Sequence, residues 1–173
     1  LGGINAKLPV DVLLKRIEAA PDDFHATHDS IGKQYRYRIH NDRLRPLFDR
    51  QRMWHVPQPL DADAMHRAGQ AIVGKHDFAA FQAVGSPRES TVRTIHSLTV
   101  SRGKGEDAAQ VTIEVHGDGF LYNMVRIIAG SLVDVGASRR DEAFLGEALA
   151  SCDRTQAGMT APAQGLVLVE VLY

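Results

Sequence analysis

Residues 117–136 read GDGFLYNMVRIIAGSLVDVG, and they are the most informative segment of the chain. Apolar residues recur in this segment at helical spacing and extend around nearly the whole circumference, which predicts a helix buried on most sides. We expect Gly136 to end this helix in a left-handed conformation, and Gly130 to let another backbone approach closely. The residues that set the spacing are Leu121, Met124, Val125, Ile128, Leu132 and Val135.

Arg126 is the only charged residue between Asp118 and Asp134. A guanidinium keeps its proton, so in an apolar helix it needs a carboxylate, a phosphate or a water-filled cavity beside it. Two interpretations follow from the residues alone. Arg126 either closes an internal ion pair or reaches out to water, or it lines an active site.

Composition indicates a soluble globular protein. The chain has 173 residues, 44% of them hydrophobic, which is enough for one well-buried domain. Its apolar runs are far shorter than the roughly 20 residues that span a bilayer, and its N-terminus lacks the pattern of a signal peptide. The single cysteine, Cys152, excludes an internal disulfide framework and suits a reducing cytoplasm.

The formal net charge is -1, but cations gather in one short segment. Between Lys33 and Arg52 only Asp42 and Asp49 are acidic. Because arginine dominates this segment, we expect phosphate contact rather than mere solubility. The seven cations of the segment are Lys33, Arg36, Arg38, Arg43, Arg45, Arg50 and Arg52.

Periodicity predicts an α+β fold. Strands are expected over residues 33–41, 94–101, 109–116 and 165–173, and helices over 61–74, 117–136 and 141–151. The segment 74–85 is predicted to be a loop, and the apolar run 165–173 a central strand. Residues 1–30 fit a helix or a strand equally well. This order suits a ferredoxin-like sandwich, with a mostly antiparallel sheet and helices packed on one face.

Within the first predicted strand, Tyr35 and Tyr37 alternate with Arg36 and Arg38, which gives one aromatic and one cationic face.

Two other groups of polar residues invite a functional interpretation. His25 and His28 have the spacing of a metal-ligand pair, but no third ligand is evident, so the sequence does not indicate a metal site. His76 and Asp77 are adjacent, and adjacent side chains do not converge on one substrate atom without special geometry. We interpret them as structural residues.

Four motifs resemble those of the TruA-type tRNA pseudouridine synthases, and the resemblance covers almost the entire chain. They are F-L-Y-N-M-V-R before an apolar helix, K/R-x-Y-x-Y, G-x-H-D-F-x-x-F and D-R-T-x-A-G-x-T-A-P-A-x-G-L. The resemblance implies that residues 1–30 end a preceding N-terminal domain and connect it to the next. Residues 31–173 would then form the C-terminal pseudouridine synthase domain.

Members of that family isomerise uridine to pseudouridine in the anticodon stem-loop of tRNA, at family positions 38, 39 and 40, without cofactor or metal, and they are homodimers. The target base must first leave its stack. The resemblance implies three substrate-binding residues. Tyr35 stacks on the flipped uracil and assists proton transfer, Arg126 pairs with the catalytic carboxylate and holds it ionised, and Leu166 packs against the base. Arg36, Arg38, Arg43 and Arg45 are candidate RNA contacts.

The family's catalytic aspartate lies in an R-T-D-x-G-V-H motif, and the chain has no such run. Arg93-Thr94 is followed by Ile95, and Arg154-Thr155 by Gln156. We expect the nucleophile upstream of Leu1, so that this chain is a C-terminal part that is inactive alone. A smaller departure is Ile127, where the family usually has Asn.

Two alternatives stay open. The chain could be a non-catalytic RNA-binding module, although it lacks an RNP-type aromatic motif. It could also be a structural or dimerisation domain in which Arg126 forms an internal ion pair. Substitution of Arg126 separates these cases from an active site.

Overall fold

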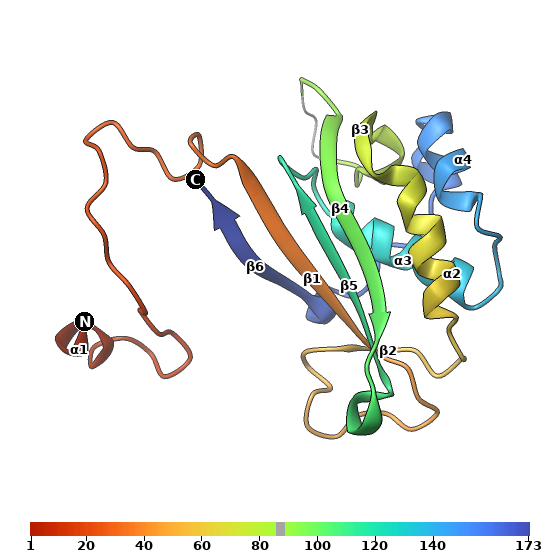
Figure 1. Cartoon of the computed structure of the whole chain (residues 1–173), viewed down its shortest axis with the longest axis horizontal. Helices are drawn as coiled ribbons and strands as arrows, with labels where there is room; N and C mark the ends of the chain where they lie inside the picture. The colour runs from red at the N-terminus through yellow and green to blue at the C-terminus, as the bar shows by residue number, and fades with distance from the viewer. Residues whose placement is uncertain (86–88) are drawn as a thin grey trace.

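A computed structural model describes residues 1–85 and 89–173 of the chain. A six-stranded sheet forms one layer, and the helices α2, α3 and α4 form a second layer on one of its faces (Figure 1). The strands are β1 (Gly32–His40), β2 (Trp54–His55), β3 (Gly74–Asp77), β4 (Val92–Arg102), β5 (Gln110–Gly117) and β6 (Leu166–Leu172). The α-helices are α1 (Gly2–Asn5), α2 (Ala62–Gly69), α3 (Met124–Gly136) and α4 (Phe144–Ser151). This architecture confirms the predicted α+β class with helices on one face.

β1 pairs with three other strands of the sheet. It pairs antiparallel with β5 along one edge, while β6 and the short parallel strand β2 share its other edge. β4 continues the sheet beyond β5, and β3 closes it. Consecutive strands β4 and β5 form an antiparallel hairpin, over the two ranges that the sequence predicts as strands.

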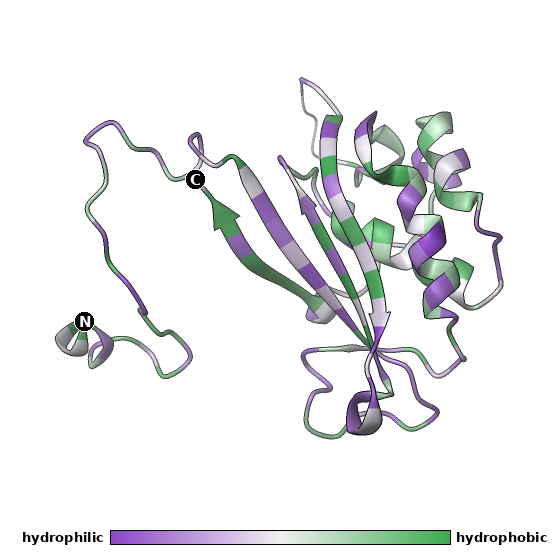
Figure 2. Cartoon of the chain, in the orientation of Figure 1, coloured by the Kyte–Doolittle hydropathy of each residue, from purple (hydrophilic) through white to green (hydrophobic). Residues whose placement is uncertain are grey.

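Hydrophobic and hydrophilic residues alternate along β4 and β5 (Figure 2), and burial divides the strands into a core face and an open face. Tyr37 and Ile39 of β1 are fully buried under the helices, whereas Arg36, which precedes Tyr37, is exposed on the opposite face. The same period holds in β5, where Val111, Ile113 and Val115 are buried. Period-two burial of this kind is what a sheet with one solvated face requires.

Helix α2 begins where the sequence predicts. Asp61 is its N-cap, and its side chain accepts a hydrogen bond from the Ala64 backbone N–H at 2.9 Å. The helix ends earlier than expected, at Gly69, and a 3₁₀ turn carries the chain from Gln70 to Ile72. Met65, Ala68 and Ile72 are buried in the core.

Helix α3 confirms the prediction of a helix buried on most sides, since nearly all of its residues are buried. A Cβ on Gly130 would lie 1.9 Å from the Met159 carbonyl oxygen, so this glycine does permit a close backbone approach. The expectation for Gly136 is wrong: its φ is not positive, and Ser138 (φ 56°) is the left-handed residue after the helix. A Cβ on Gly136 would lie 2.6 Å from the Met65 sulfur, so close packing against Met65 requires a glycine at this position.

The prediction that the last strand is central is also wrong. Among the described residues β6 pairs only with β1, and Val167, Leu168 and Val169 are 40–48% exposed. Apolar residues on both faces of a strand usually indicate that both faces are covered. The described residues do not cover both faces of β6. The predicted loop over residues 74–85 is likewise partly a strand, β3, and the buried side chains of Phe78 and Phe81 anchor the rest of the segment.

Residues 1–31 run beyond β6, away from the rest of the molecule (Figure 1). Apart from α1 they form neither a helix nor a strand, and none of them is buried. Contact with the sheet is limited to its end, where the Ile31 N–H donates to Leu172 and Phe24 packs edge-on against Tyr173. No helix among the described residues is long and apolar enough to cross a membrane.

Candidate active site

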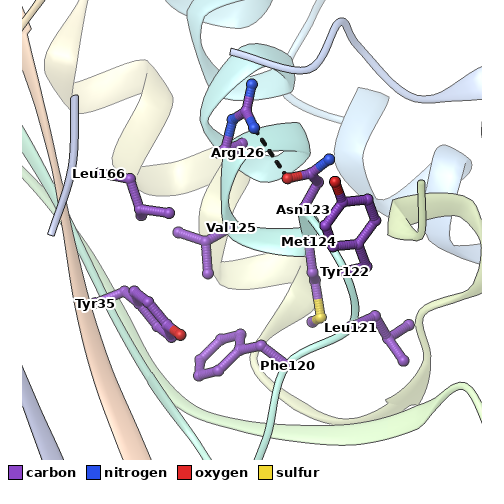
Figure 3. A pocket seen from close by; sticks show the side chains of 9 residues that line it. All are labelled: Tyr35, Phe120, Leu121, Tyr122, Asn123, Met124, Val125, Arg126 and Leu166. Atoms are coloured by element: carbon purple, nitrogen blue, oxygen red, sulfur yellow. Dashed lines mark hydrogen bonds between the residues drawn. The ribbon is translucent and has the colours of Figure 1, made fainter. Parts of the chain in front are cut away.

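A cavity of about 240 Å³ lies between the N-terminus of α3 and the strands β1 and β6 (Figure 3). Aromatic and aliphatic side chains form most of its wall, and one guanidinium stands at its edge. This volume is below the roughly 300–1,000 Å³ of sites for drug-sized ligands, so the cavity suits one small planar group. It is lined by Tyr35, Phe120, Leu121, Tyr122, Asn123, Met124, Val125, Arg126 and Leu166.

The cavity therefore brings together the three substrate-binding residues that the sequence analysis selected. Tyr35 comes from β1, Arg126 from the first turn of α3, and Leu166 from the start of β6. The register of β1 and β6 pairs Tyr35 with Leu168 and Tyr37 with Leu166. Tyr35 and Leu166 are therefore diagonal neighbours on the same face of the two strands.

Asn123 turns the chain into α3 with a left-handed backbone, φ 59° and ψ 8°. Asparagine is among the best N-cap residues, yet this side chain makes no capping hydrogen bond. Its Oδ1 instead accepts a hydrogen bond from Arg126 Nη1 at 3.0 Å. The helix start thus gives up a cap and orients the guanidinium.

Arg126 has only neutral partners among the described residues. Its Nε donates to the Ala161 carbonyl at 2.7 Å, and the Ala161 N–H donates back to the Arg126 carbonyl at 3.1 Å. None of the ion pairs between described residues includes Arg126. The internal ion pair considered from sequence is therefore absent from this part of the chain, and the charge stays available to an anionic group.

The loop that carries Ala161 is held tightly against α3. Ser131 Oγ accepts from the Gly158 N–H and donates to the Ile127 carbonyl, both at 2.9 Å. Arg154 Nη1 donates to the Gly158 carbonyl at 2.9 Å. These contacts give the D-R-T-x-A-G-x-T-A-P-A motif a structural role, because they fix the carbonyl that orients Arg126.

Tyr35 and Phe120 form the aromatic wall, with ring centroids 5.2 Å apart and planes at 85°. Burial raises the pKa of the Tyr35 phenol above its usual value, so the hydroxyl is protonated at neutral pH. Behind this wall, the Tyr37 hydroxyl donates to the Pro162 carbonyl at 2.6 Å. Burial strongly raises the pKa of Tyr37, and the Arg126 charge offsets part of that rise.

The candidate RNA-contacting arginines lie apart from the cavity. Arg36 faces the open side of the sheet, where it pairs with Glu114 at 2.7 Å, and Arg38 lies on the same face with its Nε buried and unpartnered. Arg43 and Arg45 are exposed in the loop after β1.

The remaining polar candidates have structural surroundings. Rings of His25 and His28 lie 4.3 Å apart on the surface, and no group of three metal-binding side chains occurs among the described residues. His76 Nε2 bonds to the Val73 carbonyl, while Asp77 accepts from the Ala79 N–H and from Thr91.

Sequence reasoning did not single out the cavity residues Phe120, Tyr122 and Asn123, nor the Ala161 carbonyl. The first three belong to the F-L-Y-N-M-V-R motif, so treating each of its residues as a site candidate would have found them. No sequence signal identifies a particular backbone carbonyl.

An aromatic wall, an aliphatic wall and an uncompensated arginine define a site for a flat, small group beside an anion. Comparison with known sequences identifies the protein family to which the chain belongs. The family profile described as tRNA pseudouridine synthase matches residues 68–173. The chain therefore belongs to the tRNA pseudouridine synthase family.

Several curated relatives carry the name tRNA pseudouridine synthase A. The protein from Ruminiclostridium cellulolyticum is 45% identical over 170 residues, which is 98% of this chain and 68% of the relative. The Brevibacillus brevis protein is 44% identical over 170 residues, again 98% and 68%. For the Escherichia fergusonii protein the identity is 41% over 171 residues, 99% of this chain and 62% of the relative. The chain thus spans about two thirds of the length of these relatives.

Proposed function

We propose that this chain supplies the uridine pocket of a tRNA pseudouridine synthase, an isomerase that converts uridine to pseudouridine. The observation that carries the proposal is Arg126, whose charge meets only the neutral oxygens of Ala161 and Asn123 at the edge of a base-sized aromatic cavity. Arg126 is half-buried, and holding a guanidinium there with only neutral partners costs free energy, so we infer that an anionic group from outside these residues faces it.

Each wall of the cavity has a part in holding the base. Tyr35 stacks on the uracil that has left the RNA helix, and Leu166 packs against its other side. Because the Tyr35 phenol stays protonated at neutral pH, it can donate a hydrogen bond or a proton to the base. Arg126 lowers the pKa of the catalytic carboxylate and keeps it ionised.

That carboxylate comes from outside these 173 residues. No acidic side chain among the described residues lines the cavity, and the chain contains no R-T-D-x-G-V-H run. We place it in a domain that precedes residues 1–30, which then act as the connection to the synthase domain of residues 31–173. The chain alone is accordingly inactive.

The family resemblance sets the finer terms of the proposal. The substrate is the anticodon stem-loop of tRNA, the enzyme works as a cytoplasmic homodimer, and the reaction uses no cofactor or metal. Among the arginines selected from sequence, exposed Arg43 and Arg45 are the stronger candidates for RNA contact, since Arg36 is already paired with Glu114.

A chimera tests the function directly. This chain replaces the matched 68% of the R. cellulolyticum relative, and pseudouridine formation is measured on unmodified tRNA by mass spectrometry of nuclease digests. We expect product from the chimera and none from the chain alone.

Thermal unfolding of the chimera serves as the folding control. A folded chimera that binds tRNA without forming product would favour a non-catalytic RNA-binding module. Product from the 173-residue chain alone would refute the assignment of the carboxylate.

A further inference from the structure

Residues 41–53 form a loop between β1 and β2 at one end of the sheet (Figure 1). Asn41 fixes the base of this loop with four hydrogen bonds. Its Nδ2 donates to the carbonyls of Val56 and Gln58, and its Oδ1 accepts from the Leu60 N–H and from Arg102 Nη2, at 2.6–3.1 Å. All the bonds that the side chain can make are used.

The first turn of the loop is held as well. His40 Nε2 lies 3.0 Å from the Leu44 carbonyl, and His55 Nε2 lies 2.9 Å from the Asp42 carbonyl. The Asp42 carboxylate accepts from the Leu44 N–H at 2.8 Å. The first turn of the loop is therefore preorganised, and binding to it costs little ordering entropy.

Four arginines project from this loop without a carboxylate partner. Arg43, Arg45, Arg50 and Arg52 are all exposed, and none forms an ion pair with a described residue. Among the other exposed arginines of the described residues, Arg140 also lacks a carboxylate partner and lies over the Phe144 ring, but four are paired. Four ion pairs occur among the described residues, and they join Arg16 to Glu18, Arg36 to Glu114, Arg67 to Glu142 and Arg139 to Asp134.

Apolar side chains stand out from the same loop. Phe48 is 95% exposed, Leu44 78% and Leu47 68%. Beside them lies a hollow of about 750 Å³ whose lining includes Arg43, Leu44, Pro57 and Pro59. An exposed ring among unpaired guanidinium groups resembles the sites that proteins use for unpaired nucleotides, where cations contact phosphates and aromatic rings stack on bases.

We propose that residues 41–53 are a second RNA-binding surface, in which the arginines contact phosphates and Phe48 stacks on an unpaired base. The proposal rests on tRNA being the substrate, as argued above. RNA supplies both the negative charge and the flat apolar faces that this surface matches, and arginine is better suited than lysine to phosphate.

The surface acts at a distance from the cavity. Tyr35 in β1 and Asn41 just after its end are six residues apart, which corresponds to about 20 Å of extended chain. At about 3.4 Å per stacked nucleotide, an RNA must continue for roughly six nucleotides to occupy both places. The loop thus contributes affinity and orientation, and takes no part in the chemistry.

The first test measures binding of the 173-residue chain to unmodified tRNA by fluorescence anisotropy, between about 50 and about 200 mM salt. Arg43→Gln and Arg45→Gln are compared with Lys75→Gln, which removes one exposed charge from β3 at the far edge of the sheet. We expect each loop variant to weaken binding roughly fivefold and to reduce the salt slope by about 1, with no change in Lys75→Gln.

The second test separates stacking from general apolar contact. Phe48→Ala and Phe48→Leu are measured in the same assay, and both are expected to weaken binding about tenfold, because leucine keeps apolar area but lacks a ring face. Full affinity in Phe48→Leu with loss in Phe48→Ala would overturn stacking, because it would show that any apolar side chain at this position is enough for RNA binding.

Two results would overturn the RNA surface itself. One is unchanged affinity and salt slope in Arg43→Gln and Arg45→Gln, and the other is failure of the chain to bind tRNA in this salt range. Neither decides the fate of the cavity, which the product assay of the chimera tests separately.

Discussion

Replacing Gly130 with alanine should destabilise the protein, although the same change in most helices is stabilising. A Cβ at this position lies 1.9 Å from the Met159 carbonyl oxygen. Real Cβ contacts are almost never shorter than 3.0 Å, so the two backbones must separate by at least about 1.1 Å. The loop that would move holds Gly158 and Ala161, which bond to Ser131 and Arg126.

Three contributions determine the change in the free energy of unfolding. Overpacking costs about 2 kcal/mol. Weakening the Gly158–Ser131 and Ala161–Arg126 hydrogen bonds costs about 2 kcal/mol more, and the gain in helix propensity returns about 1 kcal/mol. The expected net loss is about 3 kcal/mol, which lowers Tm by roughly 6–12 °C for a chain of this size.

Gly146→Ala in α4 is the matched control, because its Cβ would meet only Ala71 Cβ at 3.5 Å, an ordinary contact. We expect this variant to gain about 0.5 kcal/mol. Thermal and urea unfolding of both variants measure the difference. If Gly130→Ala proved as stable as Gly146→Ala, the claim that the loop is held tightly against α3 would be refuted.

Three further substitutions test particular contacts. Ser131→Ala leaves the buried Gly158 N–H without an acceptor and should cost about 1–3 kcal/mol in urea unfolding. Tyr37→Phe removes the bond to Pro162 and should cost about 1 kcal/mol at neutral pH. Because burial raises the pKa of native Tyr37 above the ordinary 10.0, this phenol ionises first in the unfolded chain. Its stabilising contribution is therefore complete below about pH 10 and declines above it, so the two Tm curves should converge in alkali. Asn41→Ala should cost about 2 kcal/mol through loss of its four bonds.

The elements that could be predicted from sequence are those whose burial is periodic. β1 and β5 alternate over most of their length, and α3 is apolar on nearly every side, so each pattern admits one structure. The close backbone approach at Gly130 could also be predicted, because a glycine within a buried helix usually marks a place where another chain segment packs closely.

The errors have physical causes too. β6 is apolar on both faces, and composition cannot distinguish a central strand from an edge strand whose faces are uncovered among the described residues. β3 is only four residues long, too short for a period to appear. Gly136 followed an apolar run, which usually marks a helix end, but its size serves the contact with Met65.

The site was predictable only in part. Tyr35, Arg126 and Leu166 could be chosen by resemblance, and they do line one cavity. The orientation of Arg126 could not be foreseen, because it depends on an asparagine that does not cap its helix and on a carbonyl that lies 35 residues further along the chain.

The proposed uridine site depends most on Arg126, so the decisive measurement is the rate of pseudouridine formation by the chimera with Arg126→Gln. Arg139→Gln, an exposed arginine just beyond the other end of α3, serves as the matched control. With folding intact in both, we expect Arg126→Gln to reduce the rate at least about 100-fold and the control to change it little. Equal rates in the two variants would contradict the assignment of this cavity as the uridine site.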